Sequence, residues 1–234
     1  MEKIIYLLWR EPGTAAEAWH RELRERLGAR LVAAGAHGAR LNLDDAEVRD
    51  TEALRQRVID PQPDALLQVW VDSAIRFLRA DIDAAVAAHS ARHAAYLVTE
   101  SQAIVNRAHP PLRGQRTAGF AQIAVLRKPQ RLTYAQWLDT WHNSHTPVGI
   151  ETQSNFEYVQ NVIVRVLTPD APAIDAIVEE CFPAEAMRDP YVFFDAAGNE
   201  AKFKANLDRM MASVHRFIDP GTIDVLISSQ YTLL

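Results

Sequence analysis

The sequence is poor in cysteine: Cys181 is the only one among 234 residues. A single thiol cannot form a disulfide within the chain, and it cannot supply the paired thiolates of a structural zinc site. We therefore expect a protein of a reducing compartment, and a cytoplasmic location is the simplest expectation.

Long hydrophobic runs and clustered positive charge are also missing. The apolar run 4–9 is too short for a signal sequence or a membrane-spanning helix, and it suits a buried strand. The formal net charge is -5, with 25 Lys and Arg against 30 Asp and Glu. Duplex binding needs clustered basic residues. We expect neither a membrane nor a nucleic acid as a partner.

Several catalytic motifs are absent as well. The sequence contains no glycine-rich phosphate loop and no serine nucleophile elbow. His142 and His145 are three residues apart and could share one helical face, but no third ligand accompanies them, so we predict no metal site. The composition, 48% hydrophobic and 24% charged, is that of an ordinary globular protein.

What the sequence does contain is an internal repeat. An offset of 118 residues sets Trp19 over Trp137 and KIIYLLWR (3–10) over AQIAVLRK (121–128). PDALLQVWVDS (63–73) resembles AIDAIVEECFP (173–183), and AAYLVTESQAI (94–104) resembles TIDVLISSQYT (222–232). Each half is therefore predicted to run strand, helix, strand, strand, helix, strand.

Hydrophobic periodicity and turn residues give approximate boundaries for these elements. We predict strands at 3–10, 37–44, 65–72, 94–105, 119–128, 155–168, 173–182 and 222–233, and helices at 14–34, 74–89, 133–146 and 200–216. The first half spans 1–106, a linker spans 107–118, and the second half spans 119–234.

A β-α-β-β-α-β unit forms a four-stranded antiparallel sheet with both helices on one face. The other face of the sheet must be covered. Two such units in one chain can cover each other, so we predict an α+β fold. Two ferredoxin-like halves would pack sheet to sheet as a barrel, with helices outside and a space between the sheets.

The helix predicted at 133–146 carries an aromatic stripe. Tyr134, Trp137 and Trp141 follow helical spacing, His145 continues the stripe, and His142 lies at its edge. Thr133 is a suitable N-cap, and Pro147 should stop or kink the helix at Thr146. His145 would then face inward from the last turn.

The environment of His145 has opposing effects. A helix C-terminus favours the imidazolium, whereas burial against Trp favours the neutral ring, so the direction of the pKa shift stays open. His145 could act as an acid or base near neutral pH, or it could be a hydrogen-bonded core residue. In the repeat it falls on Leu27, and His142 falls on Arg24. This asymmetry favours a site in the second half.

Two more segments are candidates for lining a site. In the strand 155–168, Tyr158 and Gln160 share one face and Asn161 the other. We expect Tyr158 and Gln160 to line the space inside the barrel and Asn161 to lie on the helix side; ordinary strand polarity is the alternative. The run YVFF at 191–194 is either a lid over the barrel mouth or core packing.

Three pieces of the second half resemble one known family. The run from Trp141 to Pro147 fits the W-x-x-x-H-x-P pattern of EthD-domain proteins, FEYVQNVIV (156–164) resembles that family's Tyr-x-x-Asn strand, and FIDP (217–220) resembles its ending. The second half resembles an EthD domain along nearly its whole length, and the first half resembles a diverged copy. The loop 183–199 is longer than in a minimal member.

This resemblance implies a dimeric α+β-barrel fold. Because family members are mostly homodimers of one unit, the chain looks like a fused dimer, which could itself form a homodimer. The wider superfamily includes cofactor-free monooxygenases and cyclases, lactone isomerases, and haem proteins. For the EthD group the resemblance implies degradation or tailoring of small organic molecules.

We therefore weigh three functions. The first is a cofactor-independent lyase, isomerase, cyclase or monooxygenase acting on a hydrophobic aromatic or polyketide-like compound. His145 would be its acid or base, and the substrate-binding residues would be Trp141, His142, Tyr158, Gln160 and Asn161. The second is a haem protein with His145 as axial ligand and Arg127 and Lys128 near the propionates. The third is a non-catalytic module that binds a small ligand or serves assembly.

Overall fold

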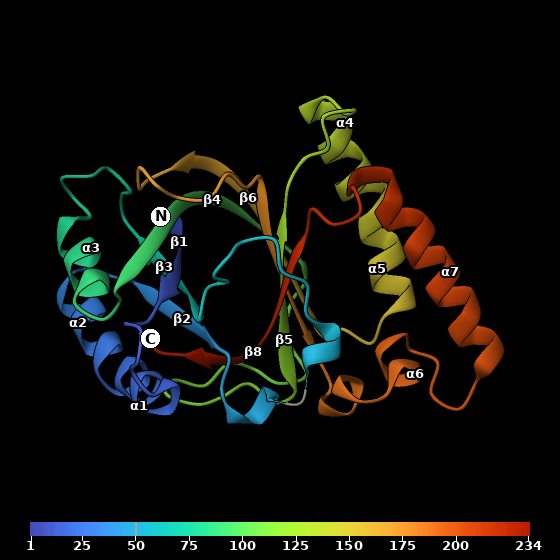
Figure 1. The fold of residues 1–234 in the computed structure, drawn as a ribbon, viewed down its shortest axis with the longest axis horizontal. Helices are drawn as coiled ribbons and strands as arrows, with labels where there is room; N and C mark the ends of the chain where they lie inside the picture. Colours follow the sequence, from blue (N-terminus) through green and yellow to red (C-terminus); the bar gives the residue numbers. More distant parts are fainter. Residues whose placement is uncertain (50) are drawn as a thin grey trace.

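Eight antiparallel strands form a closed barrel at the centre of the molecule (Figure 1). The computed structural model describes residues 1–49 and 51–234. Around the barrel the strands follow the order β1-β3-β2-β8-β5-β7-β6-β4, and β4 pairs with β1 to close it. The predicted α+β barrel is confirmed at this level.

The elements follow the predicted order along the chain. In the first half they are β1 (Glu2–Trp9), α1 (Ala16–Glu22), η1 (Leu23–Leu27), α2 (Gly28–Ala33), β2 (Gly38–Leu43), η2 (Ala46–Val48), η3 (Glu52–Leu54), β3 (Ala65–Val71), α3 (Ala80–Ala87) and β4 (Arg92–Ile104). In the second half they are β5 (Phe120–Leu126), α4 (Tyr134–Asp139), η4 (Thr140–His145), α5 (Thr146–Thr152), β6 (Glu157–Val166), β7 (Ala176–Phe182), η5 (Ala184–Met187), α6 (Pro190–Phe193), α7 (Glu200–Phe217) and β8 (Asp224–Thr232).

The strands of each half lie side by side in the barrel. The first half contributes β4-β1-β3-β2 and the second contributes β8-β5-β7-β6, which is the same internal order. The two groups meet where β2 pairs with β8 and β4 pairs with β6. That the chain arose as a fusion of two units stays a prediction.

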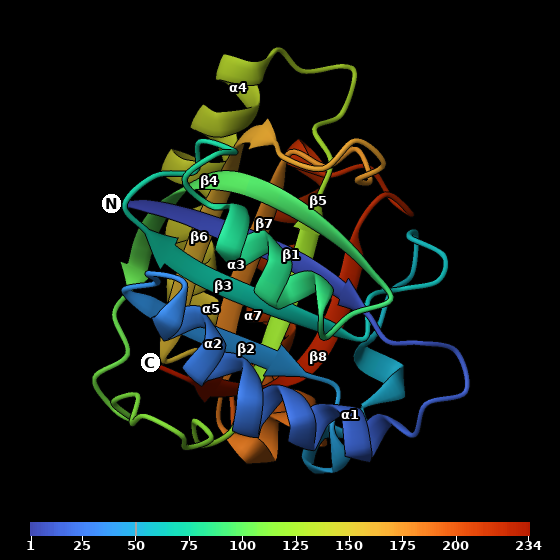
Figure 2. The same ribbon diagram turned by 90° about the vertical axis from the view of Figure 1, so that its left-hand side faces the viewer.

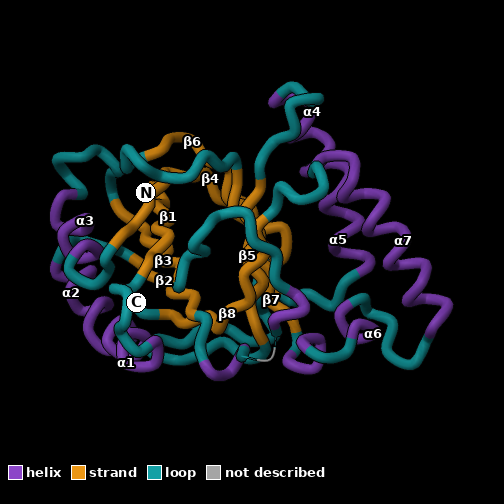
Figure 3. The backbone as a smooth tube through the Cα atoms, viewed as in Figure 1, coloured by secondary structure: helices purple, strands orange, loops and turns teal. Residues whose placement is uncertain are grey.

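Helices cover the barrel on two opposite sides. Helices α1, α2 and α3 lie over the first group of strands, whereas α4, α5 and α7 lie over the second (Figures 1 and 2). Coloured by secondary structure, the chain shows strands in the middle, helices at either side and α6 below α5 and α7 (Figure 3). Among the described residues, hydrophobic clusters therefore form on the helix-facing sides of both groups of strands and inside the barrel.

Strand alternation sorts the side chains into these cores. In β1, Ile4 and Tyr6 pack under the helices with Trp19, while Ile5 and Leu7 point into the barrel. Because both faces of β1 are buried, its sequence is a continuous hydrophobic run from Ile4 to Trp9.

Side chains occupy the barrel interior, where we expected a space. One part is apolar, and the rest is a hydrogen-bonded polar network around Glu179, which is 1% exposed. Glu179 accepts hydrogen bonds from Asn42 (2.6 Å), Gln68 (2.8 Å) and Gln230 (2.9 Å), and it pairs with Arg40 at 3.2 Å. A buried carboxylate satisfied in this way belongs to the packed core.

Of the two outcomes predicted at Pro147, a stop or a kink, the stop is wrong, because the aromatic helix of the second half continues to Thr152. It runs as α4 to Asp139, as a π-helical segment from Thr140 to His145, and then as α5 to Thr152. The wider π turn precedes Pro147, so the proline falls in the first turn of α5, where its missing N–H costs little. Thr133 caps the start, as predicted, with a capping box to Gln136.

The other departures from prediction are small. The helix expected at 74–89 begins only at Ala80, because residues 73–79 form a turn in which Arg79 donates to the carbonyl of Ala74 at 2.7 Å. Among the described residues, the helices are all too short or too polar to cross a membrane.

Candidate active site

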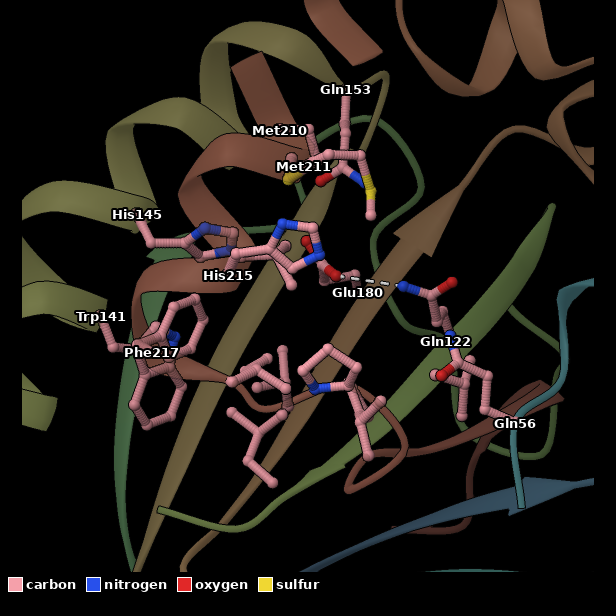
Figure 4. A pocket seen from close by; sticks show the side chains of 18 of the residues that line it. Gln56, Gln122, Trp141, His145, Gln153, Glu180, Met210, Met211, His215 and Phe217 are labelled. Atoms are coloured by element: carbon pink, nitrogen blue, oxygen red, sulfur yellow. Dashed lines mark hydrogen bonds between the residues drawn. The ribbon is translucent and has the colours of Figure 1, made fainter. Parts of the chain in front are cut away.

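A cavity of about 410 Å³ lies between the helix-facing side of the second sheet and helix α7 (Figure 4). Strands β5, β6 and β7 form its floor. The π-helical segment and α7 form its wall. The residues that line it are mostly apolar, and they include Trp141, Tyr158, Val178, Met210, Phe217 and Ile218.

Glu180 is the acidic group buried deepest in this cavity. Its side chain comes from β7 and is 8% exposed. One carboxyl oxygen accepts a hydrogen bond from Asn155 at 2.9 Å, and the other accepts from Gln122 at 3.4 Å (Figure 4). Within the described part of the chain, Glu180 has no Lys, Arg or His partner.

Burial raises the pKa of Glu180 to about 7, against the opposing effect of its hydrogen bonds from Asn155 and Gln122. At neutral pH this carboxyl is therefore present in both its acidic and its basic form. Such a group can both take up and release a proton in one reaction cycle.

The positions equivalent to Gln122 and Glu180 in the first half of the chain carry apolar residues. Gln122 and Glu180 are cross-strand partners in β5 and β7. The equivalent partners in β1 and β3 are Ile4 and Val69, both fully buried in the apolar core. The same point of the fold is thus a packed aliphatic pair in one half and a polar pair facing a cavity in the other.

His145 lies on the cavity wall, at the end of the π-helical segment. Its ring packs on Phe217, with 4.6 Å between centroids, and its Nδ1 lies 3.0 Å from the Oγ of Ser213. Burial, and then the charge of Arg216, lower the pKa of His145 to about 4. Because the helix continues to Thr152, His145 does not lie at a helix C-terminus, and burial favours the neutral ring at neutral pH.

Tyr158 forms part of the floor between these two groups. Its hydroxyl accepts hydrogen bonds from Trp141 Nε1 (3.3 Å) and Gln160 Nε2 (3.0 Å). Burial, and then the negative charge of Glu180, raise the pKa of Tyr158 to about 12. The phenol therefore stays protonated beside Glu180.

Our prediction for the faces of the strand at 155–168 was wrong. Tyr158 and Gln160 point toward the helices, where Tyr158 packs with Trp141 and Gln160 donates to Thr146 at 2.8 Å. Asn161 is on the barrel side and donates to the carbonyl of Ile177 at 3.0 Å. The assumption that failed was that the cavity lies between the sheets; it lies between sheet and helices instead.

The structure brings some predicted site residues together and separates others. Trp141, His145 and Tyr158 line the cavity. Gln160 lies beneath Tyr158, and His142 packs beside Trp141 with 4.8 Å between ring centroids. His142, Gln160 and Asn161 are not among the described residues that line the cavity, so direct substrate contacts by these three stay predictions.

The insertion at 183–199 closes one end of the cavity. Phe193 and Phe194 line the cavity, and Phe193 also stacks on Phe182 at 4.5 Å. Tyr191 stacks on Phe203 of α7 at 4.5 Å. The aromatic run is thus both a wall of the cavity and part of a packed cluster.

A segment of the first half completes the site. Leu54 and Gln56 line the cavity although they precede β3. Gln56 exchanges backbone hydrogen bonds with Val225, at 3.2 and 2.9 Å, next to β8. Neither residue was predicted, because no local pattern in the sequence reports this long-range contact.

Sequence reasoning also missed Glu180, although a signal was present. VEECF places two adjacent carboxylates in a strand that is otherwise apolar. Adjacent strand residues face opposite sides. Since both sides of this sheet are covered, both carboxylates must be buried. Glu179 is satisfied inside the barrel, which leaves Glu180 as the functional candidate.

The cavity does not suit haem. His145 offers a ring nitrogen, but no Lys or Arg is among the described residues lining the cavity to meet the propionates. Arg127 donates to Asp224 at 3.0 Å, and Lys128 donates to the carbonyl of Leu132 at 2.8 Å. A buried carboxyl without a cationic partner would also lie against the macrocycle. The donor set therefore disagrees with a haem site.

Comparison with known proteins supports the fold. Neither a protein-family model nor a curated protein sequence matches the chain, so the EthD likeness stays a resemblance. An anthrone oxidase-like protein of known structure superposes with a TM-score of 0.55 at 9% identity, over 99% of this chain and 92% of that one. It shares the α+β-barrel fold.

Two further structures are more distant. A protein from Lactobacillus acidophilus NCFM, provisionally named a monooxygenase, gives a TM-score of 0.44 at 9% identity, over 100% of this chain and 94% of that one. A protein provisionally named a chlorite dismutase gives a TM-score of 0.47 at 11% identity, over 98% of this chain and 95% of that one.

Proposed function

We propose that this protein is a cofactor-independent enzyme that moves a proton on a hydrophobic, aromatic or polyketide-like compound, with Glu180 as the acid and base. The observation that carries the proposal is a buried carboxyl without a cationic partner, facing an apolar cavity. A structural carboxylate in such a place would normally be paired, as Glu179 is.

The reaction begins when ionised Glu180 removes a proton from a carbon or oxygen acid of the substrate, next to a carbonyl or phenol. When the acid is a C–H beside a carbonyl, its electron pair becomes the C=C bond of an enolate and the carbonyl π pair moves onto the oxygen. When it is a phenol O–H, the pair stays on that oxygen, and in either case Glu180 becomes the neutral acid. Return of the proton to another atom gives an isomer, and attack of the carbanion on a second carbonyl, whose oxygen then takes the proton from Glu180, gives a cyclised product. Departure of a group on the neighbouring carbon with its electron pair and the proton from Glu180 gives lyase chemistry. With molecular oxygen as co-substrate and oxidant, the carbanion forms a C–O bond to it, Glu180 protonates the peroxide, and loss of water with the second C–H hydrogen leaves one oxygen atom on the product as a carbonyl.

The rest of the cavity favours this step by its composition. Trp141 and Phe217 stack nearly parallel, at 6.4 Å between centroids with planes 7° apart, and present flat apolar surfaces. Excluding water from the carboxylate strengthens it as a base and strengthens hydrogen bonds to the developing oxyanion. His145 was predicted as the acid or base, but with its pKa lowered to about 4 by burial it is a poor base at neutral pH.

Proton abstraction can be tested before the natural substrate is known. We expect the protein to catalyse hydrogen–deuterium exchange at the carbon beside the carbonyl of an enolisable hydrophobic ketone, such as 2-tetralone, in D₂O, measured by proton NMR. Glu180→Gln should slow the catalysed exchange by about 100-fold or more, the usual contribution of a general base.

The matched control is Glu185→Gln, which removes an exposed carboxylate a few residues along the same chain segment. It should retain exchange. Exchange that is catalysed equally by wild type and Glu180→Gln would remove Glu180 from the mechanism. If a panel of ketones and phenols binds, as seen by native mass spectrometry, without any catalysed exchange, the protein is instead a carrier of small ligands.

A further inference from the structure

His145 is held by a short chain of hydrogen bonds that reaches to the surface. Its Nδ1 lies 3.0 Å from Ser213 Oγ, and Ser213 Oγ accepts from Arg216 Nη2 at 2.9 Å. The other arm of the Arg216 guanidinium donates to Ser144 at 2.7 Å. Arg216 therefore ties α7 to the π-helical segment that carries His145.

The number of hydrogens that Arg216 and Ser213 can donate determines which tautomer of His145 fits this hydrogen-bond series. A guanidinium can only donate, so Arg216 uses one lone pair of the Ser213 hydroxyl. The hydroxyl then has one hydrogen left to give. In the described part of the chain, its only acceptor is Nδ1 of His145, because the hydrogen bonds of Ser213 go to His145 and Arg216 alone.

The opposite tautomer leaves a buried donor without a partner. If Nδ1 carried the proton, Ser213 would accept from both neighbours, and its own hydrogen would point at no acceptor in a place that is 3% exposed. Buried donors are rarely left unpaired, because their desolvation is then uncompensated. With Nδ1 unprotonated, the Ser213 hydroxyl has an acceptor for its hydrogen, and the donor left without a partner among the described residues is Nε2–H, on a ring that lines the cavity.

We infer that Arg216 and Ser213 hold His145 as the Nε2–H tautomer, so that the ring donates a hydrogen bond into the cavity to an oxygen acceptor of the ligand. Nε2 makes no hydrogen bond to the described residues, and the ring lines the cavity. The low pKa of His145, caused by burial and then by the charge of Arg216, agrees with a neutral donor.

This inference rests on the proposed function and names its ligand class more closely. The ligand is an apolar compound with a carbonyl or phenolic oxygen at His145 and an acidic hydrogen at Glu180. His145 then stabilises negative charge as it forms on that oxygen, and Glu180 holds the proton. Ser213 and Arg216 are positioning residues, which act through His145.

The tautomer can be measured without any ligand. In protein labelled with ¹⁵N at histidine, long-range ¹H–¹⁵N correlation at neutral pH should assign His145 as Nε2–H, with the signal identified by its loss in His145→Gln. Ser213→Ala and Arg216→Gln should shift the ring toward a mixture of tautomers, whereas Arg216→Lys should largely restore the wild-type signal. Arg209→Gln, which removes an exposed arginine of the same helix paired with Glu151, is the control.

Ligand selection provides the second measurement. Wild type should bind 2-tetralone about threefold to tenfold more tightly than tetralin, its counterpart without the carbonyl, as one net hydrogen bond predicts. In Ser213→Ala that preference should fall toward equality, with the affinity for tetralin unchanged.

The two proposals fail separately. An Nδ1–H ring or an imidazolium in wild type at neutral pH overturns the inference about His145, even if ketone exchange depends on Glu180. An Nε2–H ring together with a carbonyl preference, but without Glu180-dependent exchange, supports the donor and overturns the proposed reaction. An unchanged tautomer and preference in both Ser213→Ala and Arg216→Gln overturns the positioning role.

Discussion

Glu180 and His145 are the two side chains to which we assign proton chemistry, and burial shifts their pKa values in opposite directions. Burial keeps each group neutral more readily than water would, which makes the carboxyl a weaker acid and the imidazole a weaker base. In the proposed mechanism Glu180 carries the proton and His145, which lines the same cavity, is the neutral donor. Both effects should appear in the stability of the protein as a function of pH.

Glu180 should destabilise the fold as the pH rises. Its pKa is about 7 in the folded protein, against an ordinary value of 4.5, so the folded state binds the proton more tightly than the unfolded chain does. Stability is therefore lost between about pH 4.5 and pH 7, up to about 3 kcal/mol. Glu180→Gln removes this loss. Chemical denaturation from pH 5 to pH 8 should show the free energy of unfolding of Glu180→Gln rising relative to that of wild type. A difference between the two proteins that does not change with pH would contradict the account.

His145 should lower the free energy of unfolding at acidic pH. Its pKa is about 4 in the folded protein, against an ordinary value of 6.5, so the unfolded chain binds the proton more tightly than the folded state does. Wild type should therefore lose up to about 3 kcal/mol as the pH falls from 6.5 to 4. The difference between wild type and His145→Gln, measured over that range, should shrink or reverse as the pH falls. A constant difference would mean that the ring is not buried as a neutral group.

At the scale of elements, the sequence predicts the order and type of the regular structure well. Strands buried on both faces are apolar runs, and helices carry an aromatic stripe, so each left a clear pattern in the sequence. At Pro147 the sequence correctly predicted that the helix would be irregular. It could not reveal that a π-helical turn absorbs the proline and lets the helix continue to Thr152.

The wrong orientation of Tyr158 has a different cause. Alternation states which residues share a face, but not which face meets the helices. Here both faces are buried, so polarity alone does not decide between them. Trp141 Nε1 donating to the Tyr158 hydroxyl at 3.3 Å is a tertiary contact that only the assembled sheet and helix provide.

The insertion that carries α6 should set the size of ligand that the site admits. Phe193→Ala removes a ring that lines the cavity and stacks on Phe182, so we expect a larger cavity and relatively tighter binding of bulkier ketones. The loss of stability should be below the about 3–5 kcal/mol typical of a fully buried Phe→Ala, since Phe193 is only half-buried.

Phe203→Ala is the matched control for this change. Phe203 packs on the same insertion through Tyr191 and Phe194, but it is not among the described residues that line the cavity. Competition binding with ketones of increasing size separates the two variants. Equal size preferences in both would show that the insertion packs against α7 without shaping the site.

At the scale of the whole molecule, the two halves share one strand order but differ in whether the space between sheet and helices is filled. The first half fills the equivalent place with Leu27, Ile4 and Val69, whereas the second opens it around His145, Gln122 and Glu180. The first half nevertheless reaches across to the site through Leu54 and Gln56. The sequence predicted the asymmetry from His145 and Leu27, but not the crossing segment.

Ligand binding should therefore slow backbone amide exchange in the first half of the chain. Hydrogen–deuterium exchange of backbone amides, followed by mass spectrometry, should show protection of residues 51–59 when 2-tetralone saturates the site, because Gln56 is bonded to Val225 beside the cavity. Residues 16–33, on the far helices, should not change. Protection confined to the second half would show that the crossing segment is not part of the site.

The central claim is that Glu180 is a buried carboxyl that exchanges its proton near neutral pH. Infrared difference spectroscopy of wild type minus Glu180→Gln, titrated from pH 4 to pH 9, measures it directly. We predict a carboxylic acid C=O band that belongs to Glu180, half lost near pH 7, with the carboxylate band growing in its place. A carboxylate already formed at pH 5 would contradict the account, since Glu180 would then be an ordinary ionised side chain with no proton to move.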